Sequence, residues 1–407
     1  MDSQQAFDLL QAYTPGGAQT LSKQASRFPA NYPKVLSHGK DGHVVSLSGS
    51  QYIDLISGLG AISVGYSNRE VNRAVTEQLA KGVSFSLPIL LEAQVSMKLC
   101  DLVPNTKMWK FGKNGTDGTV MAVRASRAYT GRDKIMSVGY NGCADAFEIA
   151  GTRNAGIPKE LANYITKAQY NDIKSFYGLN TKEYACVILE PMAYEYPSQE
   201  FLHELRSLCN ETGTVLIFDE VVSGGRFNGF VAQSNFGVVP DLTVLSKGIA
   251  NGFPLCAVGG RRSIMCTFER SDFFASSTFG GEAVSLSACL ETLNILEVEI
   301  PAMVYKGTQI QNHFNKVFDG LAKCEGYPTR AVFKFPTDDH KAVFMQEMCL
   351  QGILLGQCMF IMASHTDYDV QQICTAIEET YSIMQPRWEN ISKLLLGAKP
   401  EPVFRVR

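Results

Sequence analysis

Two charged side chains, Lys247 and Asp219, stand where they could do chemistry together. Lys247 ends the largely apolar stretch 241–246, and a glycine-rich turn follows it at 248–252. Asp219 ends a second apolar stretch, 214–218. Both stretches have the length and composition of buried β-strands. A buried carboxylate is costly unless it is paired, so Asp219 is predicted either to cap local structure or to hold a cation.

The chain between Asp219 and Lys247 is long enough for one crossover between two parallel strands, which would bring both side chains to the same edge of a sheet. Ligands of open α/β sheets bind outside the carboxyl ends of the strands. A lysine and a carboxylate at that edge are the two groups that a pyridoxal phosphate (PLP) enzyme requires. The lysine forms a Schiff base, and the carboxylate keeps the pyridine nitrogen protonated so that the ring can accept electrons. An ordinary loop lysine is the alternative for Lys247.

Residues 111–118, Phe-Gly-Lys-Asn-Gly-Thr-Asp-Gly, form a third segment of interest. Val120, Val123 and Ala128 follow at helical spacing, so a glycine turn opens a helix here. Free N–H groups and the helix dipole suit a phosphate at such a place. The spacing fits neither the dinucleotide fingerprint nor the P-loop, and ordinary helix capping is the alternative.

The composition indicates a globular protein without nucleic-acid or membrane partners. The chain has 407 residues, of which 45% are hydrophobic and 19% charged, and its net charge is −3. No signal peptide or membrane-spanning segment is recognisable. The 11 cysteines are scattered, without zinc-ligand spacing, so we expect no metal site and reduced thiols. Together these features predict a cytoplasmic protein.

The order of elements predicts an α/β fold. Helices and strands alternate from about 68 to 290, which is typical of a mostly parallel sheet covered by helices. We expect an N-terminal arm at 1–45, a large domain at 46–295, and a smaller α+β C-terminal domain at 296–407. Helical stretches are predicted at 284–297 and 303–322, and a final amphipathic helix at 369–384.

The three segments together resemble the class III aminotransferases of PLP fold type I, especially the branch near glutamate-1-semialdehyde aminomutase. The resemblance runs from Pro15 to Thr366 and is strongest from Leu216 to Arg261. It implies a large PLP-binding domain with a mostly parallel sheet. It also implies a homodimer with shared active sites, which acts on a small-molecule amino donor and a carbonyl acceptor.

The resemblance also implies a role for individual residues. Lys247 would be the Schiff-base lysine and proton shuttle, and Asp219 would pair with the pyridine nitrogen. The cofactor-binding residues would further include Val221 and Tyr140 on the two ring faces, Gly115 and Thr116 at the phosphate, and Thr278 at the phosphate of the neighbouring subunit. Candidate substrate contacts are Lys23, Ser84, Glu190 and Glu282, with a structural role as the alternative for Glu190.

Several positions depart from the usual family sequence. Tyr-His-Gly is replaced by Tyr140-Asn141-Gly142, and Asn-Ser-Gly-Thr-Glu by residues 113–117. Lys23 stands where the aminomutase has a carboxylate-binding arginine, and lysine is the poorer bidentate partner. We therefore expect an aminotransferase with ping-pong kinetics on another substrate. A PLP-dependent isomerase (aminomutase, racemase or epimerase) is the alternative, and a binding module that has lost the chemistry is a third.

Overall fold

The computed structural model describes residues 1–198 and 200–402, whose contacts divide into two units. The sheet unit consists of Ala61–Ser63 and Arg69–Ile300. The terminal unit consists of Met1–Gly60, Val64–Asn68 and the residues from Pro301 onward. The predicted three-part division into domains stays a prediction. None of the helices in the described residues has the length and hydropathy needed to cross a membrane.

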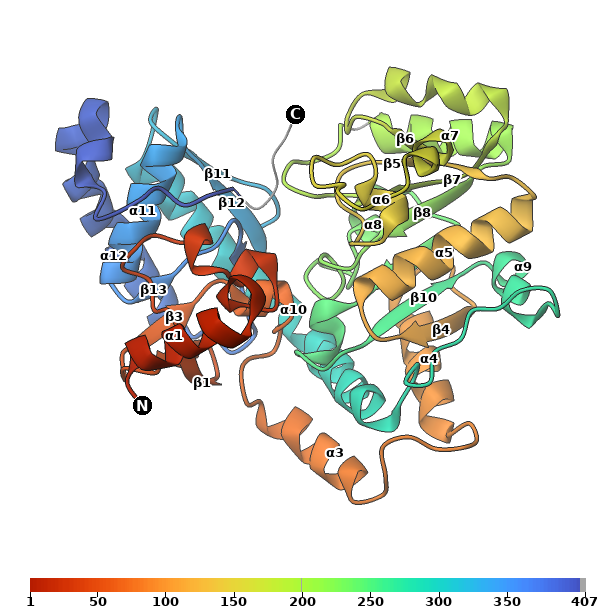
Figure 1. Ribbon diagram of the computed structural model, residues 1–407, viewed down its shortest axis with the longest axis horizontal. Helices are drawn as coiled ribbons and strands as arrows, with labels where there is room; N and C mark the ends of the chain where they lie inside the picture. Colours follow the sequence, from red (N-terminus) through yellow and green to blue (C-terminus); the bar gives the residue numbers. More distant parts are fainter. Residues whose placement is uncertain (199, 403–407) are drawn as a thin grey trace. The chain divides into compact units, whose positions relative to one another are not determined.

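A seven-stranded sheet forms the centre of the sheet unit (Figure 1). In spatial order its strands are β4 (Met108–Gly112), β10 (Cys256–Gly260), β9 (Leu242–Leu245), β8 (Val215–Asp219), β7 (Tyr184–Leu189), β5 (Lys134–Ser137) and β6 (Ile165–Lys167). The strands from β9 to β6 are mutually parallel, and β10 is antiparallel to both of its neighbours. The predicted α/β class with a mostly parallel sheet is therefore confirmed.

Helices cover both faces of this sheet because its central strands are apolar on both sides. On β8, Leu216 and Phe218 pack with α7 (Phe201–Thr212) in one core cluster. Val215 and Ile217 pack with α5 (Gly115–Thr130) and α9 (Arg262–Met265) in the other cluster. Successive side chains of a strand alternate between faces, so the next residue, Asp219, belongs to the α5 face.

The remaining helices of the sheet unit are α3 (Arg69–Leu79), α4 (Leu90–Leu102), α6 (Asp145–Glu148) and α8 (Gln233–Phe236). The short α8 lies in the crossover between β8 and β9, which are parallel neighbours. The spacing of Asp219 and Lys247 predicts this crossover correctly. The predicted strands at 214–218 and 241–246 correspond to β8 and β9.

The terminal unit contains two smaller sheets. One comprises β1 (Leu36–Lys40), β2 (His43–Ser46), β3 (Gln51–Asp54) and β13 (Ile353–Leu354), and the other β11 (Lys323–Glu325), β12 (Arg330–Lys334) and β14 (Met359–Phe360). Its helices are α1 (Ser3–Tyr13), α2 (Ser57–Gly60), α11 (Asp338–Leu350) and α12 (Asp367–Met384). The predicted helix at 369–384 is therefore confirmed, with two more residues at its start.

The helix α10 (Ala283–Val317) is longer than the sequence pattern predicts. We expected two helical stretches, at 284–297 and 303–322. A proline inside a helix removes one hydrogen bond and crowds the preceding turn. The structure has one continuous helix with Pro301 inside it. The neighbouring side chains of Ile300 and Met303 are buried, and their packing offsets the local loss.

Aromatic side chains form much of the core of the terminal unit. Phe314 on α10 is completely buried, and its ring stacks on Phe318 at 4.5 Å between centroids. Phe333 and Phe344 approach the same ring at 4.8 and 5.4 Å. Rings at such distances add about 0.5–1.5 kcal/mol for each pair beyond the burial of their surface. Phe314 therefore connects α10 to β12 and α11.

Replacing Phe314 with alanine should destabilise this unit by about 3–5 kcal/mol, because the cavity left among three rings cannot collapse fully. Urea unfolding followed by circular dichroism measures the change. Tyr305→Ala on the same helix is the control, since Tyr305 is 63% exposed and its loss should change stability by less than about 0.5 kcal/mol. Equal effects of the two substitutions would contradict this account of the core.

Candidate active site

Polar side chains gather where four neighbouring parallel strands of the sheet unit end. Asp219 is the last residue of β8, and Glu190 directly follows β7. Lys247 comes two residues after β9, and Tyr140 comes three residues after β5. The order β9-β8-β7-β5 makes these strand ends neighbours. This edge is where open α/β sheets bind ligands, and we take it as the candidate active site.

Asp219 is the most constrained of these groups, with 4% of its surface exposed. The amide nitrogen Nδ2 of Asn141 donates a hydrogen bond to Asp219 Oδ2 at 3.1 Å, and the Val221 N–H donates to Oδ1 at 3.2 Å. Burial, followed by the nearby Glu190 carboxylate, raises the pKa of Asp219 to about 6, and the hydrogen bonds and Lys247 limit the rise. A cation brought to this carboxylate would stabilise its ionised form.

Lys247 begins a short 3-10 turn, Lys247–Ala250, with a left-handed φ of 50°. Such a backbone is uncommon for a residue other than glycine and costs about 1–3 kcal/mol. The turn is held by Ser63, whose hydroxyl donates to the Gly248 carbonyl at 2.5 Å and whose N–H donates to Asn251 Oδ1 at 3.0 Å. The surrounding hydrogen bonds therefore maintain a strained backbone at the lysine.

The start of α5 matches the predicted phosphate site. Gly115 is its first residue, and Asn114 and Asp117 form a capping box around it. The N–H groups of Gly115 and Thr116 belong to the first turn, where the helix itself supplies no acceptor. A Cβ atom on Gly115 would come within 2.9 Å of Val221. Glycine is therefore required here by the close approach of Val221.

The loop after β5 is attached to α5 at two points. Thr119 Oγ1 donates to the Asn141 carbonyl at 2.7 Å, and the Cys143 N–H donates to Thr116 Oγ1 at 3.2 Å. Tyr140 precedes them in the loop and is 45% exposed. Burial, Cys143 and Glu148 raise the pKa of Tyr140 to about 12. Its ring is accordingly a neutral surface near Asp219 at ordinary pH.

Glu282 takes part in a local ion pair instead of standing open to a ligand. Lys113 Nζ donates to Glu282 Oε1 at 2.8 Å and to the Pro254 carbonyl at 3.0 Å. Glu282 also accepts from the N–H groups of Val284 and Ser285 in the first turn of α10. Burial alone would raise the pKa of Glu282, but Lys113 and Ser285 hold it below the usual value. These contacts describe a helix cap, and its predicted substrate role stays a prediction.

The other predicted site residues lie in segments away from the hydrogen bonds described around Asp219 and the start of α5. Thr278 lies in an exposed loop before α10, and Ser84 is exposed between α3 and α4. Lys23 belongs to the terminal unit, in the short 3-10 helix Leu21–Lys23. Their assigned roles stay predictions. Sequence reasoning noted Asn141 only as a departure from a pattern, because its bond to Asp219 joins residues far apart in the chain.

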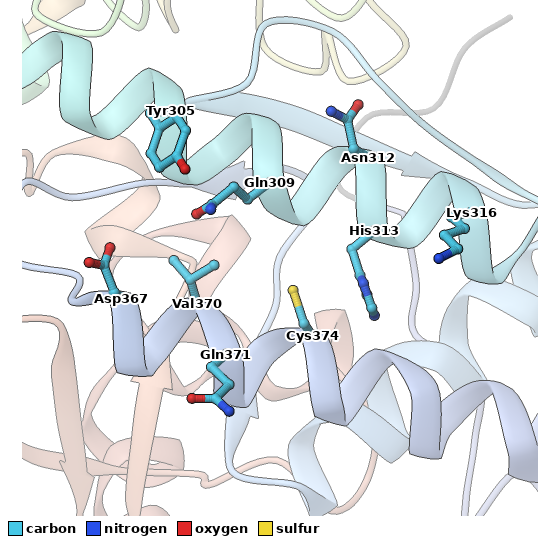
Figure 2. A pocket seen from close by; sticks show the side chains of 9 residues that line it. All are labelled: Tyr305, Gln309, Asn312, His313, Lys316, Asp367, Val370, Gln371 and Cys374. Carbon is cyan, nitrogen blue, oxygen red and sulfur yellow. The ribbon is translucent and has the colours of Figure 1, made fainter.

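A groove in the terminal unit has a volume of about 670 Å³ and lies between α10 and α12 (Figure 2). It is lined by Tyr305, Gln309, Asn312, His313, Lys316, Asp367, Val370, Gln371 and Cys374. None of these is a predicted site residue. The ends of the parallel strands remain the candidate site.

Comparisons with known proteins show which family the chain resembles. The family model for class III aminotransferases matches residues 26–325. A glutamate-1-semialdehyde 2,1-aminomutase from Natronomonas pharaonis is 31% identical over 93% of this chain and 98% of its own length. A 3-aminobutyryl-CoA aminotransferase from Cloacimonas acidaminovorans is 33% identical over 93% and 96%. The crystal structure of an omega-transaminase from Sphaerobacter thermophilus superposes with a TM-score of 0.86 at 24% identity, covering 93% of this chain and 97% of that one. The shared fold is fold type I.

The Lys113–Glu282 pair should show energetic coupling in a double-mutant cycle of Lys113→Met and Glu282→Gln. We expect about 1 kcal/mol, because both side chains are largely withdrawn from solvent and residues in contact couple by about 0.5–3 kcal/mol. The pKa of Glu282 is lowered in the folded protein, so the coupling should be full above about pH 4.3 and fade as the pH falls further. Urea unfolding at several pH values measures it.

The matched control is the Lys134–Glu183 pair in the same unit, whose side chains are 39% and 56% exposed. Lys134→Met and Glu183→Gln should couple by at most about 0.5 kcal/mol, because solvent screens an exposed pair. The same coupling in both cycles would show that burial does not strengthen the Lys113–Glu282 interaction.

Proposed function

Because the chain belongs to the class III aminotransferase family, we propose that it is an aminotransferase that moves an amino group from an amino-acid donor to a keto or aldehyde acceptor. The cofactor of the family is PLP. The observation that supports the proposal best is the placement of Asp219 and Lys247 at adjacent strand ends, beside the start of α5. An amine, a buried carboxylate and a helix N-terminus match the aldehyde, the ring nitrogen and the phosphate of PLP.

The residues of the site fit this cofactor. Asp219 is a buried carboxylate whose raised pKa marks it as short of positive charge, and a protonated pyridine nitrogen would supply that charge. The first turn of α5 offers N–H groups and the Thr116 hydroxyl to the phosphate. Tyr140 and Val221 would lie on the two faces of the ring. Val221 packs against the Gly115 position, which brings the ring wall and the phosphate site together.

When bound, PLP supplies a protonated ring that stabilises negative charge on the carbon next to the substrate's amino group. Lys247 would hold the cofactor covalently through Nζ between turnovers, and the incoming amine of the donor would displace it. The released Nζ would then carry a proton from that carbon to C4′ of the cofactor. Asp219 would maintain the proton on the ring nitrogen throughout. The same residues acting in reverse on an acceptor give two half-reactions and ping-pong kinetics.

Residues outside this network would complete the site in a homodimer. Thr278 is exposed and would bind the phosphate of the neighbouring subunit's cofactor. Gly280 and Gly281, in the loop that carries Thr278, lie against Phe111 near the end of β4. Ser84, Glu190, Glu282 and Lys23 are proposed substrate contacts. For Glu282, the ion pair with Lys113 favours a structural role.

A PLP-dependent isomerase is the second candidate. The similarity to an aminomutase over 93% of the chain supports it, and an isomerase would use the same lysine and carboxylate. The two activities differ in where the amino group goes. An aminotransferase leaves the cofactor in its amino form. The cofactor must then pass the amino group to a separate acceptor. An isomerase returns the amino group to the same molecule.

A single-turnover experiment separates the two candidates. The PLP-loaded protein is mixed with candidate amino donors in the absence of an acceptor, and the cofactor spectrum and the product are followed. Conversion to the amino form, with release of a keto acid or an aldehyde and recovery upon addition of an acceptor, is expected for the aminotransferase. An isomerised product without a net change of the cofactor would support the isomerase instead. Failure to bind PLP would overturn both.

Replacing Lys247 with alanine should reduce turnover roughly 10³-fold or more, because both the covalent attachment and the proton transfer are lost. Borohydride reduction followed by peptide mass spectrometry should find the cofactor on Lys247 in the natural protein and on no residue of the variant. Lys113→Ala is the control, since that lysine pairs with Glu282, and it should keep the adduct. A cofactor adduct on another lysine would refute the assignment.

A further inference from the structure

The side chain of Asn141, in the loop after β5, donates a hydrogen bond to Asp219 from a segment outside β8. It is 1% exposed, and its Nδ2 lies 3.1 Å from Asp219 Oδ2. The carbonyl oxygen Oδ1 of the same amide is buried and accepts no hydrogen bond from the described part of the chain. A buried acceptor without a partner costs about 1–3 kcal/mol. Hydrogen bonding of Oδ1 therefore does not explain the orientation of the amide.

The backbone around Asn141 holds this orientation. Its carbonyl accepts from the buried hydroxyl of Thr119, which lies within α5. Two residues later the Cys143 N–H donates to Thr116, also on α5. Between them Gly142 has a φ of 115°, and a Cβ atom there would come within 2.7 Å of Thr116 Oγ1. The loop is therefore fixed to α5 on both sides of the asparagine.

Charged groups of both signs lie near Asp219. Glu190 after β7 opposes the ionisation of Asp219, and Lys247 after β9 favours it. Burial raises the pKa of the adjoining Glu220 and of the Tyr140 hydroxyl, and the charge of Asp219 adds to both rises. Burial and Glu190 together outweigh the favourable contacts. Each hydrogen bond that the Asp219 carboxylate accepts therefore helps to keep it ionised.

We propose that Asn141 is a positioning residue, which orients Asp219 and keeps its carboxylate ionised for the pyridine nitrogen. This inference rests on the proposed function, since it concerns the same site. The donors from Asn141 and Val221, which bind different oxygens, hold the carboxylate in one plane. The amide N–H of Asn141 is a donor at every pH. An imidazole at this position would gain a positive charge below about pH 6.5. Asn141 therefore supplies a donor that does not itself titrate.

The test measures the protonation of Asp219 in the protein without cofactor. Infrared difference spectra recorded against pH follow the protonated carboxyl group, which is assigned by its absence in Asp219→Asn. The natural protein should titrate near pH 6. Asn141→Leu should raise the midpoint by about one to two pH units, because a hydrogen bond to a charged group is lost. The same midpoint in both proteins would overturn the proposal.

Asn141→His tests the role of the hydrogen bond without removing it. The imidazole should return the midpoint to the natural value or below it, because it keeps a donor and can add a positive charge. If Asn141→Leu does not fold, a midpoint above the natural value in Asn141→His would overturn the proposal. Asn154→Leu is the matched control: Asn154 donates to the Ile149 carbonyl in the same unit, so its loss should leave the midpoint unchanged. A shift in the control equal to that of Asn141→Leu would also overturn the proposal.

A second measurement links the asparagine to the cofactor. PLP affinity of Asn141→Leu should fall about tenfold or more near neutral pH and recover at higher pH, where Asp219 ionises without help. A shifted midpoint in a protein that binds no PLP would refute the proposed function while supporting the role of Asn141. Normal PLP binding with an unshifted midpoint would refute the role of Asn141 alone.

Discussion

A carboxylate buried at the end of a central strand must receive hydrogen bonds and a nearby positive charge, or it takes up a proton. Asp219 is in that position, and several parts of the sheet unit are arranged around it. The loop after β5 is fixed to α5 and supplies the amide of Asn141. The strained turn after β9 brings Lys247 to the neighbouring strand end. Burial and Glu190 oppose the effect of both groups on Asp219, and its pKa of about 6 reflects this balance.

The parity of β8 decides which helix can share a ligand with Asp219. Alternate residues of this strand face opposite sides of the sheet, and Val215 and Ile217 belong to the side that packs on α5. Asp219 has the same parity and so lies on the same side. A shift of one residue in β8 would point the carboxylate toward the α7 side, away from the first turn of α5. The placement of carboxylate and phosphate site on one face therefore depends on the register of a single strand.

The parts of this structure that depend on local pattern could be predicted from the sequence. The apolar stretches before Asp219 and Lys247 predict β8 and β9, and the length between them predicts the crossover. The glycine turn at 112–115 predicts the start of α5. Each of these follows from hydrophobicity, glycine content and chain length, which are properties of short segments.

The contacts between distant segments could not be predicted in the same way. The bond between Asn141 and Asp219 and the pair between Lys113 and Glu282 depend on tertiary packing, which no local signal carries. A resemblance suggested a substrate role for Glu282, whereas its neighbours form a helix cap around it. The continuation of α10 through Pro301 has the same origin, since burial of the flanking residues outweighs a local helix-breaking preference.

The close approach of Val221 to Gly115 links the sizes of two side chains that are far apart in the sequence. Val221 fills the space that any side chain at residue 115 would need. Natural drift or protein engineering can therefore enlarge residue 115 only if residue 221 becomes smaller in the same step. A smaller side chain at residue 221 would remove the contact that requires glycine at residue 115. Residues 115 and 221 should therefore be varied together. Mutant libraries that vary only one of them would miss the combinations that the fold tolerates.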